Sequence, residues 1–254
     1  MNKRQLLALA VVPALLAACG GGDDGFTDRA DIADPKVRLV HAIPGGPNIS
    51  LLRGNLALGS DVTDMAYKGA SNYFDTDRSP HFWEVRTATT PSVSVGSHTF
   101  ETHVGNRYTM VAVPDVGSLT SVVLIGDPYN KSITSDDARV RVFNAASNTA
   151  GVDLYLTGPA VSITNLAPNL AGAGYKQAVP ASGADSIDLE GGTYSLRLTT
   201  AGTKTVIFTA LVSIPANADW LLVPIPASAT PGDVRVLVIQ SGFGPPSTEL
   251  VNQP

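Results

Sequence analysis

The chain has 254 residues, of which 44% are hydrophobic and 15% charged, with 24 glycines and 18 prolines. This composition is typical of a folded, turn-rich protein and argues against a disordered one. The formal net charge is −5, and no cluster of Lys and Arg occurs after residue 18. Nucleic acid is therefore excluded as an expected partner, because proteins that bind it need clustered positive charge.

The first eighteen residues have the three parts of a secretory signal peptide. Lys3 and Arg4 precede an apolar stretch over residues 6–18, which ends in small residues just before Cys19. This stretch is shorter than the roughly 20 residues that a membrane-spanning helix needs. We therefore predict that residues 1–18 are a signal peptide and are removed.

The residues around the predicted cleavage point, 16–19 (LAAC), resemble the lipobox of bacterial lipoproteins. The resemblance implies cleavage between Ala18 and Cys19, a diacylglyceryl group on the Cys19 sulfur and usually an acyl chain such as palmitate on the new amino group. Two or more acyl chains hold a protein on a membrane durably. The expected location is the cell envelope, and Gly20 implies the outer rather than the inner membrane if the host is Gram-negative. The alternative is an ordinary signal peptide with a chance cysteine.

Cys19 is the only cysteine, so the mature chain has no intramolecular disulfide and, once lipidated, no thiol for catalysis or metal binding. No cofactor is expected. The segment that follows, residues 20–25 (GGGDDG), has nothing to bury. We therefore predict a lipidated, flexible and disordered tether over residues 19–35.

The rest of the chain repeats itself. Residues 37–42 (VRLVHA) are echoed by residues 140–145 (VRVFNA), and the order of the later matches is kept. Those matches pair residues 67–68 with 175–176, 83–86 with 194–197, 108–111 with 220–223, and 121–125 with 235–239. We predict one repeat over residues 36–131, a linker over 132–137, a second repeat over 138–243 and a C-terminal tail over 244–254.

Within each repeat, short runs alternate between apolar residues and other residues, as Val37 and Leu39 alternate with Arg38. The runs are separated by Gly, Pro, Asn and Asp clusters, and no long segment has a helical stripe. The predicted fold class is all-β, with two tandem immunoglobulin-like antiparallel β-sandwich domains after the tether. A small barrel in each repeat is the alternative architecture.

The repeated pattern resembles a known family. Its elements are Val-Arg-x-x-His/Asn-Ala, a turn, Val-Asp-Leu-Tyr and later Gly-Gly-Thr-Tyr-x-Leu, as in residues 140–155 and 191–198. This pattern is similar to the domain of unknown function 4397, here in two copies, with residues 50–52 and 79–83 departing from it in the first. The resemblance implies secreted or envelope-attached bacterial proteins and brings no catalytic residues.

Residues for catalysis or metal binding are sparse. His41, His81, His98 and His103 all lie in the first repeat, and the odd spacing of His98 and His103 puts them on opposite faces of an unbroken strand. No Gly-x-Ser-x-Gly motif occurs. We therefore expect neither a metal site nor a catalytic site.

Aromatic residues are the remaining candidates for a ligand site. Those at matched positions of the repeats, such as Trp83 and Trp220, are expected in the core. Tyr73, Phe74, Phe82 and Tyr129 lie in less regular segments and are the candidates for exposed ligand contacts.

The expected function is that of a membrane-anchored envelope lipoprotein with two non-catalytic modules for binding or scaffolding. Its partners would be the membrane, through the lipid on Cys19, and an envelope protein or glycan. One alternative is a structural spacer of the envelope. The other is a hydrolase with its site in the loops of the first repeat, which requires His81, His98 or His103 beside a carboxylate.

Overall fold

A computed structural model describes residues 26–30, 32–59 and 62–253, and their regular secondary structure consists almost wholly of strands joined by turns and loops. Helix α1 (Phe26–Arg29) precedes the strands. In chain order they are β1 (Lys36–His41), β2 (Ile49–Arg53), β3 (Leu56–Ala57), β4 (Phe74–Asp75), β5 (Pro80–Thr87), β6 (Ser94–Glu101), β7 (Arg107–Pro114), β8 (Thr120–Asp127), β9 (Ala138–Phe143), β10 (Gly151–Thr157), β11 (Leu170–Gly174), β12 (Ala178–Val179), β13 (Ile187–Leu189), β14 (Gly192–Thr200), β15 (Val206–Ile214), β16 (Asp219–Pro226), β17 (Val234–Ile239) and β18 (Ser247–Leu250). The all-β prediction is confirmed.

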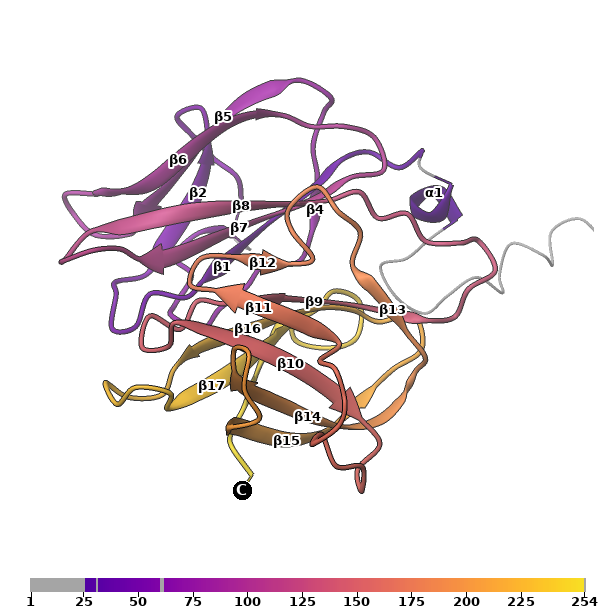
Figure 1. Cartoon of the computed structure of the whole chain (residues 1–254). Coiled ribbons are helices and arrows are strands. Elements are labelled where there is room, and N and C mark those ends of the chain that lie inside the picture. The colour runs from indigo at the N-terminus through magenta and orange to yellow at the C-terminus, as the bar shows by residue number, and fades with distance from the viewer. Residues whose placement is uncertain (1–25, 31, 60–61, 254) are drawn as a thin grey trace, which may run out of the picture.

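The first eight strands form a sandwich of two sheets. One sheet has the order β4-β1-β7-β8 and the other β3-β2-β5-β6 (Figure 1). The core between them takes alternate residues of each strand, such as Leu39 of β1, Trp83 of β5 and Met110 of β7, all with 0% exposure. A sandwich rather than a barrel is therefore the architecture of this half.

The later strands repeat this arrangement. One sheet has the order β11-β10-β14-β15, and the other runs β12-β9-β16-β17-β18, with β13 also paired to β9. Each half contains one parallel pair, β1 with β7 and β9 with β16. The sheets that contain these pairs are thus mixed, whereas purely antiparallel sheets were expected. Parallel neighbours need a long crossover connection, and here strands β2 to β6 lie between β1 and β7, and strands β10 to β15 between β9 and β16.

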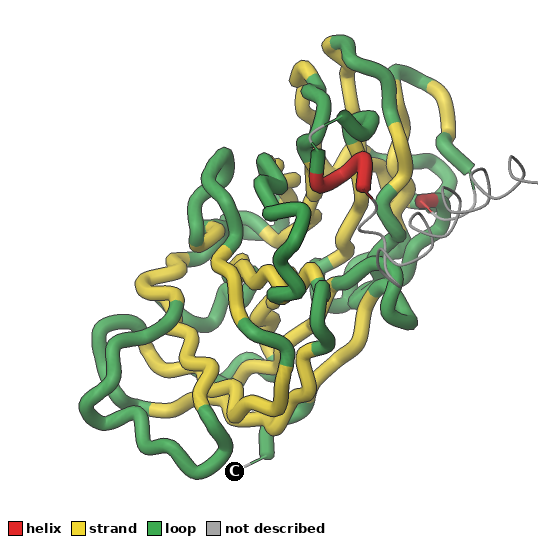
Figure 2. The backbone as a smooth tube through the Cα atoms, turned by 90° about the vertical axis from the view of Figure 1, so that its right-hand side faces the viewer, coloured by secondary structure: helices red, strands yellow, loops and turns green. Residues whose placement is uncertain are grey.

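The two sandwiches stack on one another through the sheets that contain β1 and β9, so that four sheets lie in layers (Figures 1 and 2). The apolar cluster between these inner sheets takes residues from both halves, such as Val40 and Val111 from the first and Phe143 and Leu221 from the second. The inner strands are consequently buried on both faces, as the pattern of β7 shows. This buried contact makes the two halves one folded body.

Residues 26–35 differ from the expected flexible tether. Helix α1 has only four residues, too few for an isolated helix to be stable, so it depends on contacts with the body. Asp28 is buried and pairs with Lys36 and Arg107 at 3.0 and 3.1 Å. Arg29 donates to the backbone oxygens of Ile133 and Ser135. The predicted tether therefore ends earlier than expected; its residues 19–25 lie outside the described part.

No helix in the described ranges is long and apolar enough to cross a membrane.

The predicted C-terminal tail is also part of the fold. Strand β18 pairs with β17 and extends the inner sheet of the second half. Beyond it, Asn252 and Gln253 hydrogen-bond to Thr209 and Leu211 along the edge strand β15. The expectation of a tail over residues 244–254 was wrong, because this segment supplies partners to two strand edges that would otherwise be open.

Two matched turns tie the halves together reciprocally. Lys68 and Lys176 occupy equivalent positions and both have left-handed backbone conformations, with φ of 70° and 63°. Lys68 of the first half pairs with Glu249 of the second at 2.7 Å. Lys176 of the second half pairs with Asp115 of the first at 2.8 Å. Each half thus forms an ion pair with the other from the equivalent turn, as expected for two related units.

Candidate functional site

The lipidation and cleavage residues from the sequence, Cys19 and Ala18, lie outside the described residues. Among the four aromatic candidates, Phe82 is exposed as predicted, with 45% of its surface accessible. Phe74 is instead half-buried and packs on the core residue Trp83, with ring centroids 6.2 Å apart. It sits on β4, a two-residue strand that pairs with β1, so the segment is more regular than it appears in sequence.

The other two aromatic candidates point into the body. Tyr129 is 1% exposed, and the Tyr73 hydroxyl lies 3.3 Å from the hydroxyl of Thr109. Tyr129 is therefore buried and not exposed as expected, while Tyr73 and Phe74 are half-buried; a role of these residues as ligand contacts stays a prediction. The low exposure of the two tyrosines results from the contact between the two sandwiches, because this contact covers segments that would be exposed in a single sandwich.

A Ser–His–Asp group does occur in the first half. The Ser79 hydroxyl donates to Asp77 at 2.7 Å, and His81 Nε2 lies 2.9 Å from Asp77 and 3.0 Å from the Ser79 oxygen. Hydrogen bonds from Ser79 and His81 lower the pKa of Asp77 to about 2.

This group lacks the geometry of a catalytic triad. A triad histidine uses one ring nitrogen for the nucleophile and the other for the carboxylate. Here a single atom, His81 Nε2, faces both, and Ser79 directs its proton to Asp77 rather than to the histidine. The three residues form a hydrogen-bonded cluster at an exposed strand end and do not carry the hydrolase alternative.

Of the remaining histidines, His103 is exposed, and His41 and His98 contact the backbone. His98 Nε2 lies 2.7 Å from the Val122 oxygen, which links β6 to β8. His41 is fully buried, with Nε2 donating to the Pro47 oxygen and Nδ1 accepting from Ile43. No group of three or more His, Cys, Asp or Glu side chains suited to a metal occurs in the part of the chain that the structure describes.

Many of the buried charged side chains of the described residues lie where the two sandwiches meet, near the starts of β1, β7, β9 and β16. We call this group the polar junction; its charged members are Asp28, Arg38, Arg107, Asp127, Arg139, Arg141 and Asp219. All seven are buried, each at most 9% exposed. They continue the face of the inner strands that is apolar further along, because Arg38 shares its face with Val40, and Arg141 with Phe143.

Arg107 is the centre of one ion-pair group in the polar junction. It bonds to Asp219 at 3.0 Å and to Asp28 at 3.1 Å. Burial by itself lowers the pKa of Arg107, but the carboxylates of Asp219 and Asp28 raise it above its ordinary value. The guanidinium is therefore charged at every physiological pH.

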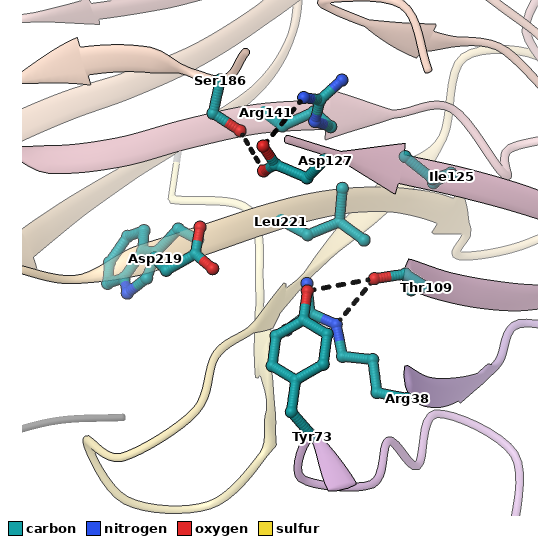
Figure 3. Close-up of a pocket in the computed structure, with 10 residues that line it drawn as sticks. Arg38, Tyr73, Thr109, Ile125, Asp127, Arg141, Ser186, Asp219 and Leu221 are labelled. Atoms are coloured by element: carbon teal, nitrogen blue, oxygen red, sulfur yellow. Dashed lines mark hydrogen bonds and ion pairs between the residues drawn. The ribbon is translucent and has the colours of Figure 1, made fainter. Parts of the chain in front are cut away.

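Asp127 is the centre of the other group. It accepts from Arg139 at 2.9 Å and from Ser186 at 2.9 Å, and Arg141 lies 3.7 Å away (Figure 3). Tyr129 lies between the two groups, with its ring centre 3.5 Å from the Arg107 guanidinium and 4.4 Å from that of Arg139. The ring thus separates two positive charges and attracts both.

The ion pairs of the polar junction hold the two halves together, as Arg107 of the first half and Asp219 of the second show. The three buried carboxylates of the polar junction each accept from a guanidinium, so none is placed as a general base. Burial raises the pKa of Tyr73, so this residue stays a neutral hydroxyl. Removing one partner of such a buried pair costs about 3–5 kcal/mol, since the other charge is left without compensation.

Sequence reasoning missed these residues. Arg38 and Arg141 were visible as the repeated Val-Arg motif, and the signal available was that both copies keep an arginine amid apolar strand residues. The positions of Asp28, Asp127 and Asp219 gave no such signal, because their partners come from distant segments.

A second feature lies at the opposite end of the contact between the halves. A groove of about 480 Å³ follows the ends of β1, β9 and β16, and both halves line it. Its lining residues are Pro44, Ser147, Asn148, Pro226, Ala227, Ser228 and Ala229. We call it the distal groove; it carries neither a charged nor an aromatic lining residue.

Comparison with known proteins gives one family. No curated protein matches the chain. Residues 35–155 match the model of the family described as a domain of unknown function (DUF4397); the match spans the first sandwich, strand β9 and most of β10. The chain therefore contains a DUF4397-like domain.

Proposed function

We propose that this protein is a lipid-anchored module of the bacterial cell envelope that presents the loops at its distal end to an envelope protein, without catalysis. The anchor rests on the signal peptide and the lipobox-like residues 16–19. The second sandwich, in this proposal, is another copy of the DUF4397-like domain, because its strand order is the same as that of the first.

The observation that carries the proposal is the docking of α1. Because Asp28 and Arg29 hold this helix on both halves, only residues 20–25 separate Cys19 from the body. Seven backbone steps from Cys19 to Phe26 span at most about 25 Å. A lipid on Cys19 would therefore keep the polar-junction end close to the bilayer and the distal end away from it.

The distal end is suited to a protein partner. The distal groove lies there, and so does the turn between β7 and β8, where Val116 is 84% exposed and Leu119 70% exposed. Exposed apolar side chains with polar residues beside them are a feature of protein-binding surfaces. Carbohydrate sites use aromatic platforms, and the groove has none among its lining residues.

The anchor is tested by expressing the full chain and a Cys19→Ala variant in a Gram-negative host with a labelled fatty acid. We expect label and membrane fractionation for the parent, and neither for Cys19→Ala. Label in the variant, or an unlabelled parent, would overturn the anchor.

Presentation by the distal end is tested by placing a photo-crosslinking amino acid in the anchored protein, at Ser228 in the distal groove or at Asp188 on β13 as the control. Both positions are exposed. We expect a discrete cross-linked envelope protein from Ser228 alone. Equal products from both positions, or none from Ser228, would contradict the proposed binding face.

A further inference from the structure

The last strand of the second half, β18, connects the two halves. It pairs with the edge of β17, where Thr248 lies opposite Val238. The residues on either side of Thr248 contact the first half. The Ser247 hydroxyl donates to the Lys68 carbonyl at 2.6 Å, and the Glu249 carboxylate lies 2.7 Å from Lys68 Nζ. An extended segment therefore bridges the edge of β17 and the turn at Lys68.

The matching place on the first half is an open groove. Residues 123–125 of β8 correspond to residues 237–239 of β17, and Lys176 corresponds to Lys68. Among the described residues, no strand pairs with the outer edge of β8 as β18 pairs with β17. The groove has a volume of about 320 Å³, and it is lined by Val123, Leu124, Ile125, Lys176, Gln177, Ala178, Ala181 and Ser182. It is thus the counterpart of the place that β18 occupies.

The edge of β8 offers backbone groups to a partner at Leu124. The Gly126 N–H donates to the Ser182 hydroxyl and its carbonyl accepts from Gly183, so the Gly126 backbone faces away from β7. Leu124 lies two residues earlier in a regular strand, so its N–H and carbonyl face the same way. Neither group has a hydrogen-bond partner within the described ranges.

The open part of this edge is short. At one end residues 182–183 cover Gly126, and at the other His98 Nε2 lies 2.7 Å from the Val122 carbonyl. A pairing segment therefore has room for one residue opposite Leu124. Because side chains alternate along a strand, the two neighbours of that residue point to the second half, as the neighbours of the paired residue in β18 point to the first.

Lys176 gives the groove its preference for an acidic side chain. Its ammonium group has three N–H donors and pairs with Asp115 at 2.8 Å. The other residues that line the groove are uncharged. A second carboxylate would therefore bond to the ammonium group of Lys176 and be repelled by Asp115 alone, a balance that variants of both residues can measure.

We propose that this groove binds an extended segment of a partner protein with the pattern Ser/Thr-x-Glu. Its middle residue pairs with the Leu124 backbone, its carboxylate bonds to Lys176 Nζ, and its hydroxyl donates to the Lys176 carbonyl, as the matching groups of β18 do at Lys68. Addition of a strand to a sheet edge is a recurrent mode of peptide recognition. The groove shares no lining residue with the distal groove and does not depend on the lipid anchor, so it can fail without the proposed function failing.

The direct test titrates the purified full chain against a fluorescent peptide with the sequence of residues 246–251 (PSTELV). We expect saturable binding, and none when the threonine of the peptide is N-methylated, because that removes the N–H that pairs with Leu124. A photo-crosslinker in the peptide should give products at residues 123–125 or 176–182. Products at residues 235–239 would mean exchange with β18. That result, equal binding of the N-methylated peptide, or no saturable binding would overturn the proposal.

The second test changes the charge at the groove. Lys176→Gln should weaken binding of the peptide about two- to fivefold, as expected for a partly exposed ion pair, and Asp115→Asn should strengthen it by a similar factor. Arg86→Gln on β5 is the matched control and should bind as the parent does. A parent protein that binds the peptide equally well with Gln in place of Glu would contradict the proposal whether or not the variants fold.

Discussion

His41 and Asn144 occupy equivalent positions at the ends of β1 and β9, and the structure gives them the same task. Each is fully buried, and each accepts from the backbone N–H two residues later, His41 from Ile43 at 3.3 Å and Asn144 from Ala146 at 2.9 Å. Each also donates to a backbone oxygen of its own half. We therefore predict that His41→Asn is tolerated while His41→Ala is not.

The magnitudes follow from these two bonds. His41→Ala leaves the buried Ile43 N–H unpaired, at about 1–3 kcal/mol, and adds a cavity worth about 1 kcal/mol. The Pro47 oxygen belongs to an exposed residue and can bond to water, so its loss adds little. His41→Asn restores the acceptor and should cost about 1 kcal/mol. The difference of about 2 kcal/mol corresponds to roughly 4–8 °C in Tm for a chain of this size.

The two variants also differ in pH dependence. Burial lowers the pKa of His41, and its hydrogen bond to Pro47 offsets only part of that effect. Its neutral form thus stabilises the fold fully above the unfolded pKa of about 6.5, and that stability is lost as the pH falls towards the lower folded pKa. Between pH 7.5 and 5.5 the parent protein should lose more stability than His41→Asn.

Urea unfolding of the parent, His41→Asn and His41→Ala at both pH values measures all of these differences. Asn144→Ala is the matched control and should lose about as much stability as His41→Ala, but it should keep the parent's pH dependence because His41 is still present. If His41→Asn is as unstable as His41→Ala, or keeps the parent's pH dependence, the two positions are not equivalent.

Three further predictions concern the contact between the halves. Asp219→Ala removes a carboxylate of Arg107 and should lower the free energy of unfolding by about 3–5 kcal/mol, whereas Asp188→Asn at an exposed site should change it by at most about 0.5 kcal/mol in the same urea titration. A protease site inserted after Thr134, in the exposed linker, should give two fragments that elute together in size-exclusion chromatography and separate only in denaturant. The reason is that the apolar cluster between the inner sheets remains after cleavage. Fragments that separate in native buffer would refute this prediction. Deleting residues 246–254 should lower the Tm and leave the edge of β17 open to aggregation, which light scattering on heating would detect. Glu249→Gln alone should lower the free energy of unfolding by less than about 1 kcal/mol, because the ion pairs of Glu249 are partly solvated.

The sequence by itself predicted the local structure well. Alternation of Val37 and Leu39 with Arg38 depends only on the two-residue period of a strand, and it placed β1 and its sandwich core correctly. The recurrence of Val-Arg and Tyr-Lys at matched positions pointed to two related units, and the strands of both halves do occur in the same order. The sequence did not show how Ser79, His81 and Asp77 are arranged. Only the distances show that His81 Nε2 faces both of the other residues, which is not the geometry of a catalytic triad.

Only the tertiary structure decided the other face of the inner strands. In a single sandwich Arg38 and Val40 would face water, and nothing in their local pattern shows that a second sandwich covers them. That contact buries Tyr129 and half-buries Tyr73, which were both expected at the surface. It also brings Arg107 to Asp28 and Asp219, from segments 79 and 112 residues away. The same holds for α1 and β18, which are short segments held by distant partners. Strand periodicity is a local property of the chain, whereas the pairing of charges and the covering of a face depend on which distant surfaces meet.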